Sequence, residues 1–194
     1  HAYFGMVESF RAQTRMIVAI VQQAEEILKL PHLAITAVRD LANPEDIEAL
    51  IVEVRKALQV GLSDPIPNLV RAVERAGVVV LRLALTLERH DSFSVWPNFG
   101  LDGRPVIVLT GAKPGDRDRF NVAHELGHLI LHSARLVADS RQAEREAHRF
   151  AGALLLPKNV ASEAIRPPVT LRVLMAVKQH YGISIAAAAQ RALD

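Results

Sequence analysis

Residues 120–132 decide the fold and read Phe120-Asn121-Val122-Ala123-His124-Glu125-Leu126-Gly127-His128-Leu129-Ile130-Leu131-His132. Their apolar residues recur at helical spacing, and we expect a helix that begins near Asp116 or Asp118 and ends at about His132. Within it, the pattern H-E-x-x-H runs from His124 to His128. Residues four apart on a helix project from one face, so the two imidazoles can converge on one metal ion.

Glu125 is predicted to act as a general base and not as a ligand. It is rotated about 100° from His124 on the helix, so it would reach a water molecule beside the ion. Zinc lowers the pKa of a bound water to about 7, and a carboxylate can then take its proton at neutral pH. The alternative is a chance match on an ordinary helix. The small residue Gly127 and the apolar residues around the motif favour a real site.

A catalytic zinc site needs a third protein ligand and one open position. His132 lies about 12 Å along the helix from His124 and about 80° around it, so one ion cannot touch both. We expect His132 to support a ligand or to act as a cation near the helix C-terminus. On the next helix Glu144 and His148 share a face, whereas Glu146 is turned about 200° from Glu144 and is expected to point to solvent. The residues alone leave a metal ligand and a solvated charge run as alternatives here.

Composition limits the other classes of function. The 194 residues are 50% hydrophobic and 23% charged, which indicates a folded protein. The chain has no cysteine, so thiolate metal sites and disulfides are excluded. The formal charge of +2 is too small to indicate nucleic-acid binding by itself. No apolar run approaches the roughly 18 residues that span a bilayer, and the first thirty residues lack the order of a secretory signal. We therefore expect a cytoplasmic protein without a membrane segment.

The remaining patterns predict a mostly helical chain with a small antiparallel sheet. Pro31 ends the first helix, Asn43 can cap the second, and turn-forming residues around Asp102 join two strands. Glycine at 182 separates the last two helices. Helices are expected over about 4–30, 43–60, 68–76, 116–132, 139–156, 170–181 and 184–193, and strands over 78–83, 92–96 and 106–109.

Two blocks of the sequence resemble the ImmA/IrrE family of metallopeptidases. The first is the segment 120–132, and the second comprises Glu144-Arg145-Glu146-Ala147-His148-Arg149-Phe150-Ala151 and Leu154-Leu155-Leu156-Pro157. A weaker likeness extends over about 68–194. The resemblance implies an α+β fold with a zincin-like peptidase core at 68–194, an active-site helix and a C-terminal helical segment at about 168–194. The helical region 1–67 resembles no family that we can name.

The resemblance also implies a ligand set. In that family zinc is held by the two histidines of the motif and by a glutamate three residues before the small residue of the second block. This implies a Zn²⁺ bound by His124, His128 and Glu144, with Glu125 as the base of a metal-assisted peptide hydrolysis. His148 stands where the family usually has Asn, so it could orient a ligand or water, or bind the metal itself. Further candidates for stabilising the transition state are His132, His148, His180 and Tyr181.

Members of the family resemble regulators that cleave a helix-turn-helix transcriptional repressor in stress responses or mobile elements. The implied partner is therefore a protein substrate. We expect an extended substrate segment to pair with a sheet edge made by 93–96 or 106–109. Two alternatives stay open: a metal-binding sensor without turnover, and a DNA-binding regulator. Residues 171–193 have the outline of a helix-turn-helix, but only Gln190 and Arg191 could read bases, so direct nucleic-acid binding is disfavoured. The N-terminal helices either pack in the core or dock a partner or a second copy, as in a homodimer.

Overall fold

The computed structural model describes residues 2–38, 46–83, 91–97, 103–111, 115–134 and 139–193, with side chains from residue 12 onward. The expected cap Asn43 and the turn at Asp102 lie outside these residues. The α+β class is confirmed. The elements, in chain order, are α1 (Ala2–Ile27), α2 (Asp46–Ala57), α3 (Leu69–Arg75), β1 (Val79–Leu83), β2 (Ser92–Val95), β3 (Val106–Thr110), α4 (Gly115–His132), α5 (Ser140–Leu155), α6 (Lys158–Ala164), α7 (Leu171–Tyr181) and α8 (Ile185–Arg191).

Helix boundaries follow the capping residues that the sequence offers. Asp139 accepts a hydrogen bond from the Arg141 amide at the start of α5. Thr170 and Ser184 cap α7 and α8 in the same way. Gly182 ends α7 in the left-handed conformation, with a φ of 64°, which costs glycine little. These local signals therefore fixed where α5, α7 and α8 begin.

The sheet is mixed and not antiparallel throughout. Its order is β1-β3-β2, with β2 and β3 antiparallel as expected and β1 and β3 parallel. The expected antiparallel sheet is therefore correct for β2 and β3 but wrong for β1, which pairs with β3 in parallel. All five residues of β3 are buried, as a central strand covered on both faces requires. β2 is therefore an edge strand of the described sheet.

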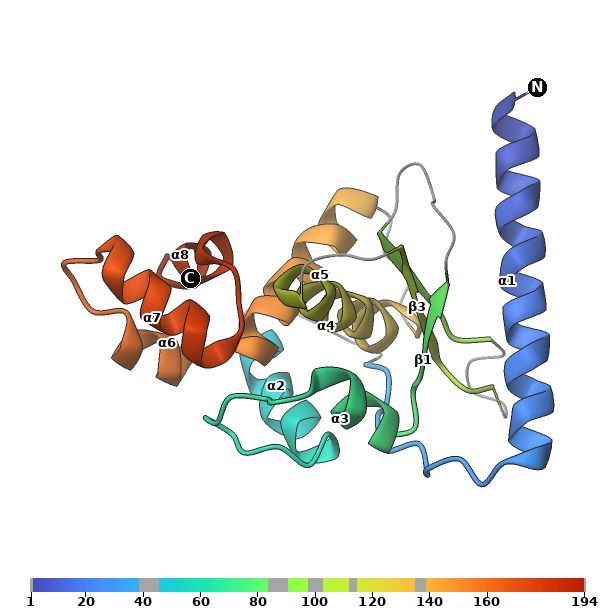
Figure 1. Cartoon of the computed structure of the whole chain (residues 1–194), viewed down its shortest axis with the longest axis horizontal. Coiled ribbons are helices and arrows are strands. Elements are labelled where there is room, and N and C mark those ends of the chain that lie inside the picture. Colours follow the sequence, from blue (N-terminus) through green and yellow to red (C-terminus); the bar gives the residue numbers. More distant parts are fainter. Residues whose placement is uncertain are drawn as a thin grey trace.

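Helices cover both faces of the sheet (Figure 1). Ile17 and Val21 of α1 pack against Val106 and Val108 of β3. The alternate residues of β3 point the other way, into the main core beneath α4. Helices α4 and α5 pack closely on that side. The arrangement fixes α4 between the sheet and α5, so residues on its two flanks face β2 and α5.

Residues before 68 contribute to the main core. Ile47, Ile51 and Leu58 are buried in the same cluster as the apolar residues of α4 and α5. Arg55 of α2 is 1% exposed and donates a hydrogen bond to the Leu154 carbonyl at the end of α5. Packing in the core, one of the two alternatives for the N-terminal helices, therefore describes α2 and the inner face of α1.

The C-terminal helices face the core as well. Arg191 is 5% exposed, donates from Nε to the Leu156 carbonyl at 3.0 Å, and pairs with Glu48 at 2.9 Å. One of the two residues that could have read bases is thus committed inside the fold. Within the described residues, no helix combines the length and the apolar character that crossing a bilayer demands.

Candidate metal centre

The site forms where α4 and α5 approach most closely. Gly127 of α4 faces α5, and a Cβ at this position would lie 3.0 Å from Phe150 Cδ1 and 3.3 Å from Ala147 Cα. Both contacts are tighter than ordinary van der Waals separations, and one of them is to backbone. Glycine therefore lets α5 come near enough for its side chains to meet the two histidines of the motif.

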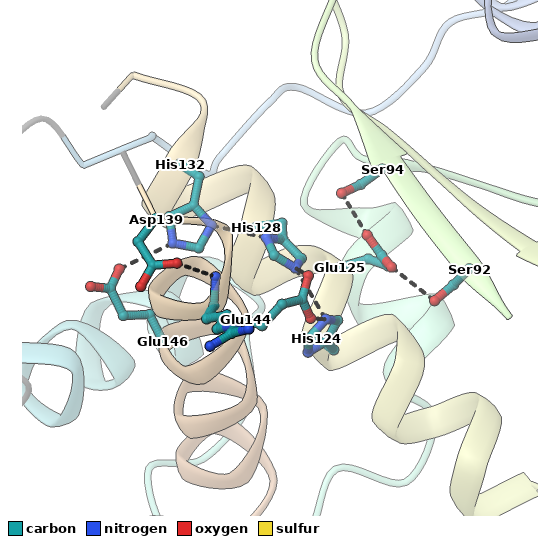
Figure 2. Close-up of polar contacts among 10 residues, drawn as sticks. Ser92, Ser94, His124, Glu125, His128, His132, Asp139, Glu144 and Glu146 are labelled. Atoms are coloured by element: carbon teal, nitrogen blue, oxygen red, sulfur yellow. Dashed lines mark hydrogen bonds and ion pairs between the residues drawn. The ribbon is translucent and has the colours of Figure 1, made fainter. Parts of the chain in front are cut away.

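Three side chains converge between these helices. The Nε2 atoms of His124 and His128 are 3.1 Å apart. Glu144 of α5 places its carboxylate over both, with Oε2 3.3 Å from His124 Nε2 and Oε1 3.4 Å from His128 Nε2. Figure 2 shows the Glu144 carboxylate next to the two rings. The chain thus brings together the three residues that the family resemblance implies as ligands.

The separations of these donor atoms fit a zinc ion. Ligand atoms arranged tetrahedrally at 2.0–2.1 Å from zinc are about 3.3–3.4 Å from one another. The two Nε2 atoms are 3.1 Å apart, and each lies 3.3–3.4 Å from a different oxygen of the Glu144 carboxylate, so all three distances are close to this spacing. The donor set of two imidazoles and one carboxylate is also typical of catalytic zinc. A cavity of about 520 Å³ adjoins the three residues and leaves room for a water or substrate.

Burial keeps the two imidazoles neutral. Burial, together with the neighbouring histidines, lowers the pKa of His124 to about 3, and burial is the largest cause. Burial is also the largest cause that lowers the pKa of His128, while Glu125 and Glu144 act in the opposite direction. A neutral imidazole retains the lone pair that a metal needs, so both rings are ready to bind an ion near neutral pH.

The lowered pKa of His124 predicts acid sensitivity of the metal-free protein. Between pH 3 and 6.5 the folded state binds fewer protons than the unfolded chain, so the free energy of unfolding falls as the pH decreases below 6.5. At about 1.4 kcal/mol per pKa unit, the loss by about pH 5 is on the order of 2 kcal/mol. Chemical denaturation of zinc-free wild type and zinc-free His124→Asn at about pH 7 and about pH 5 measures this loss in the free energy of unfolding. The variant is expected to lose less stability; an equal loss would contradict the assignment.

Glu125 lies on the opposite flank of α4, against β2. Its carboxylate accepts hydrogen bonds from Ser92 Oγ at 2.8 Å and from Ser94 Oγ at 2.7 Å (Figure 2). Burial raises its pKa, and the two hydroxyls oppose this increase. The sequence analysis missed both serines. The available signal was their spacing, because residues two apart on a strand point to the same face.

Glu146 does not point to solvent, and that expectation is wrong. Its side chain is 14% exposed, whereas that of Glu144 is 59% exposed. Glu146 Oε2 lies 3.1 Å from His132 Nε2, and His132 Nδ1 lies 2.9 Å from His128 Nδ1. The helical-wheel argument failed because His132, one turn beyond the motif, extends over the side of α5 that carries Glu146.

The other candidates divide into two groups. His148 lines the cavity, with its ring centroid 4.6 Å from that of His124. Its ligand atom lies within 4.8 Å of those of His124 and Glu144, so this second triplet could also hold a metal. Tyr181 packs against the main core, and the ring of His180 makes a T-shaped contact with that of Tyr181. Neither residue is among the described residues that line the cavity.

Comparison with known families places this site in context. A sequence model described as Peptidase_M78, the IrrE N-terminal-like domain, matches residues 73–193. That range contains β1, β2, β3 and both helices of the metal centre. No curated protein matches the chain.

Proposed function

The chain belongs to the Peptidase_M78 family of IrrE N-terminal-like domains, and from this premise we propose that it is a zinc-dependent endopeptidase. The family supports a metallopeptidase-type function. The observation that carries the finer proposal is the convergence of His124, His128 and Glu144 at 3.1–3.4 Å beside an open cavity. Glu125 lies next to them in the chain and also lines this cavity.

In this proposal His124, His128 and Glu144 hold the ion and Glu125 moves the proton. When bound there, zinc would supply Lewis acidity, which polarises a carbonyl and makes water more acidic. Glu125 takes a proton from water as the oxygen–carbon bond forms, and it gives that proton to the leaving amine as the carbon–nitrogen bond breaks. The raised pKa of Glu125 suits the first step, because a stronger base accepts the proton more readily.

We place the substrate along β2. Of the two sheet edges considered, β3 is excluded because it is central, whereas β2 is an edge strand. The wall of the cavity includes Ser92 to Trp96, so β2, an edge strand of the described sheet, borders the cavity that the proposed metal ligands also line. An extended peptide can add to such an edge through backbone hydrogen bonds. This mode would favour an unfolded or locally extended segment of a protein.

The proposed substrate is a helix-turn-helix transcriptional repressor whose cleavage relieves repression, in the cytoplasm. The likeness of the two sequence blocks to the ImmA/IrrE family supports this choice. The burial of Arg191 supports a role for this chain as the protease and not as the DNA-binding partner. A metal sensor without turnover would share the same ligands, so only a cleavage assay separates it from the peptidase.

The test is co-expression with candidate repressors, the product of the neighbouring gene first. Purified zinc-loaded protein is then incubated with the same repressor, and fragments are identified by mass spectrometry. We expect cleavage at one or a few bonds, with no general proteolysis of unrelated proteins. Zinc in protein purified without added metal, together with intact repressors, would instead support the sensor.

A further inference from the structure

A chain of polar contacts runs behind one proposed ligand. It links His128 of α4 through His132 of the same helix to Glu146 of α5, over distances of 2.9 and 3.1 Å (Figure 2). We propose that His132 and Glu146 are positioning residues that fix the protonation form of the His128 ring, so that its Nε2 lone pair faces the metal. The inference rests on the metal site of the proposed function, but not on peptidase turnover.

The direction of the chain follows from the hydrogen-bonding capacity of its members. A neutral imidazole has one N–H and one lone pair, and a carboxylate only accepts. Because Glu146 accepts, the proton of His132 is on Nε2, and His132 Nδ1 is an acceptor. The bond between the two rings must then be donated by His128 Nδ1–H. This leaves the lone pair of His128 on Nε2, the atom 3.1 Å from His124 Nε2 and 3.4 Å from Glu144.

The surroundings strengthen this chain. His132 and Glu146 expose only 12% and 14% of their side chains, so water competes little for these bonds. Glu146 is held in turn by Gln142, whose Nε2 donates to its Oε1 at 2.8 Å. Metal-bound histidines usually donate their second N–H to such an outer partner, which orients the ring.

The two histidines of the motif differ in this respect. The Nδ1 atom of His124 is buried and has no hydrogen-bond partner among the described residues. Within the described residues, a hydrogen bond at Nδ1 therefore orients the ring of His128 but not that of His124. Helix α5 holds both sides of that ring, with Glu144 at Nε2 and Glu146, through His132, at Nδ1. The position of α5 thus determines where both Glu144, a proposed ligand, and Glu146, which supports His128 through His132, lie.

The first test observes the tautomer directly in the zinc-free protein of 194 residues. Histidine is labelled with ¹⁵N, and two-bond ¹H–¹⁵N spectra are recorded near neutral pH, with the His128 signals assigned by their loss in His128→Gln. We expect the Nδ1–H form of His128 in the wild type and a shift towards Nε2–H in His132→Phe. Glu146→Gln is the second variant if His132→Phe does not fold. An Nε2–H form in the wild type would overturn the proposal.

The second test measures zinc affinity by competition with a chelator. Loss of an outer partner typically weakens metal binding about 10–100-fold, and we expect this range for His132→Phe and about tenfold for Glu146→Gln. Because both act through one chain, the double variant is expected to be no weaker than His132→Phe alone. Glu163→Gln is the matched control, since it makes the same chemical change as Glu146→Gln at an exposed position on α6. Additive losses, or wild-type affinity in both single variants, would contradict the proposal.

These readouts separate the positioning role from the peptidase. Thermal unfolding of the zinc-free variants reports any general destabilisation, which a purely structural role would produce without a change of tautomer. Neither the spectra nor the affinities require turnover. If the protein shows the expected tautomer and zinc affinities but cleaves no repressor, the proposed function is refuted and the positioning role is not. If the protein cleaves a repressor but His128 keeps the same tautomer in every variant, only the positioning role is refuted.

Discussion

Glu125→Gln is expected to keep its zinc and to lose peptide cleavage by about 10²–10⁴-fold, the range that general acid–base groups contribute. Glutamine has nearly the same shape as glutamate, and its amide can still bond to the hydroxyls of Ser92 and Ser94. It cannot take a proton from water. The carboxylate of Glu125 binds these serines and not the proposed ion, so metal affinity is expected to change little.

The measurement pairs initial rates of repressor cleavage with the zinc content of the same preparations. Glu163→Gln on α6 is a matched control, because it makes the same chemical change at an exposed position. It is expected to behave as wild type. Loss of zinc from folded Glu125→Gln would show that Glu125 has been given the wrong role. Retained cleavage would remove it as the base.

Glu144→Ala is expected to weaken zinc binding by about 10²–10³-fold. Total binding free energies of about 10–16 kcal/mol spread over four ligands correspond to a loss of this size for one of them. The side chain is 59% exposed and faces the cavity, so the free energy of unfolding of the zinc-free protein is expected to change by less than about 0.5 kcal/mol. The effect is therefore specific to the metal.

Two comparisons sharpen this measurement. Glu146→Ala is expected to weaken zinc binding less than Glu144→Ala, because Glu146 acts only through His132. His148→Ala is also expected to have the smaller effect, since the shortest donor distances belong to the other triplet. A larger loss in His148→Ala than in Glu144→Ala would make His148 the third ligand. Equal losses of zinc affinity in Glu144→Ala and Glu146→Ala would contradict the assignment of Glu144 as the ligand and Glu146 as its indirect support.

Local patterns predicted the motif and every described helix except α6, because their signals lie within a few residues. Asp139, Thr170 and Ser184 mark helix starts by capping, and the spacing of His124 and His128 specifies one face of a helix. None of these depends on a partner from elsewhere in the chain. Such features can be inferred from a single sequence.

The features that escaped prediction depend on how elements cross. Glu146 is sheltered because His132 from another helix covers it, which a helical wheel of α5 alone does not show. Ser92 and Ser94 bind Glu125 because β2 lies beside α4. β1 pairs with β3 across more than twenty residues of chain, so local periodicity could not give its direction. Each of these is a property of two segments together.

The buried guanidinium of Arg55 has a consequence for how this protein can be divided. It reaches from α2 to the end of the helix that carries Glu144, and Ile47, Ile51 and Leu58 belong to the main core. All four residues precede the segment 73–193 that defines the family. A fragment that begins at residue 73 would lack α2, so the apolar residues of α5 that pack against α2 would be exposed to water. Recombinant protein that contains residues 73–193 is therefore expected to need α2 as well in order to fold stably.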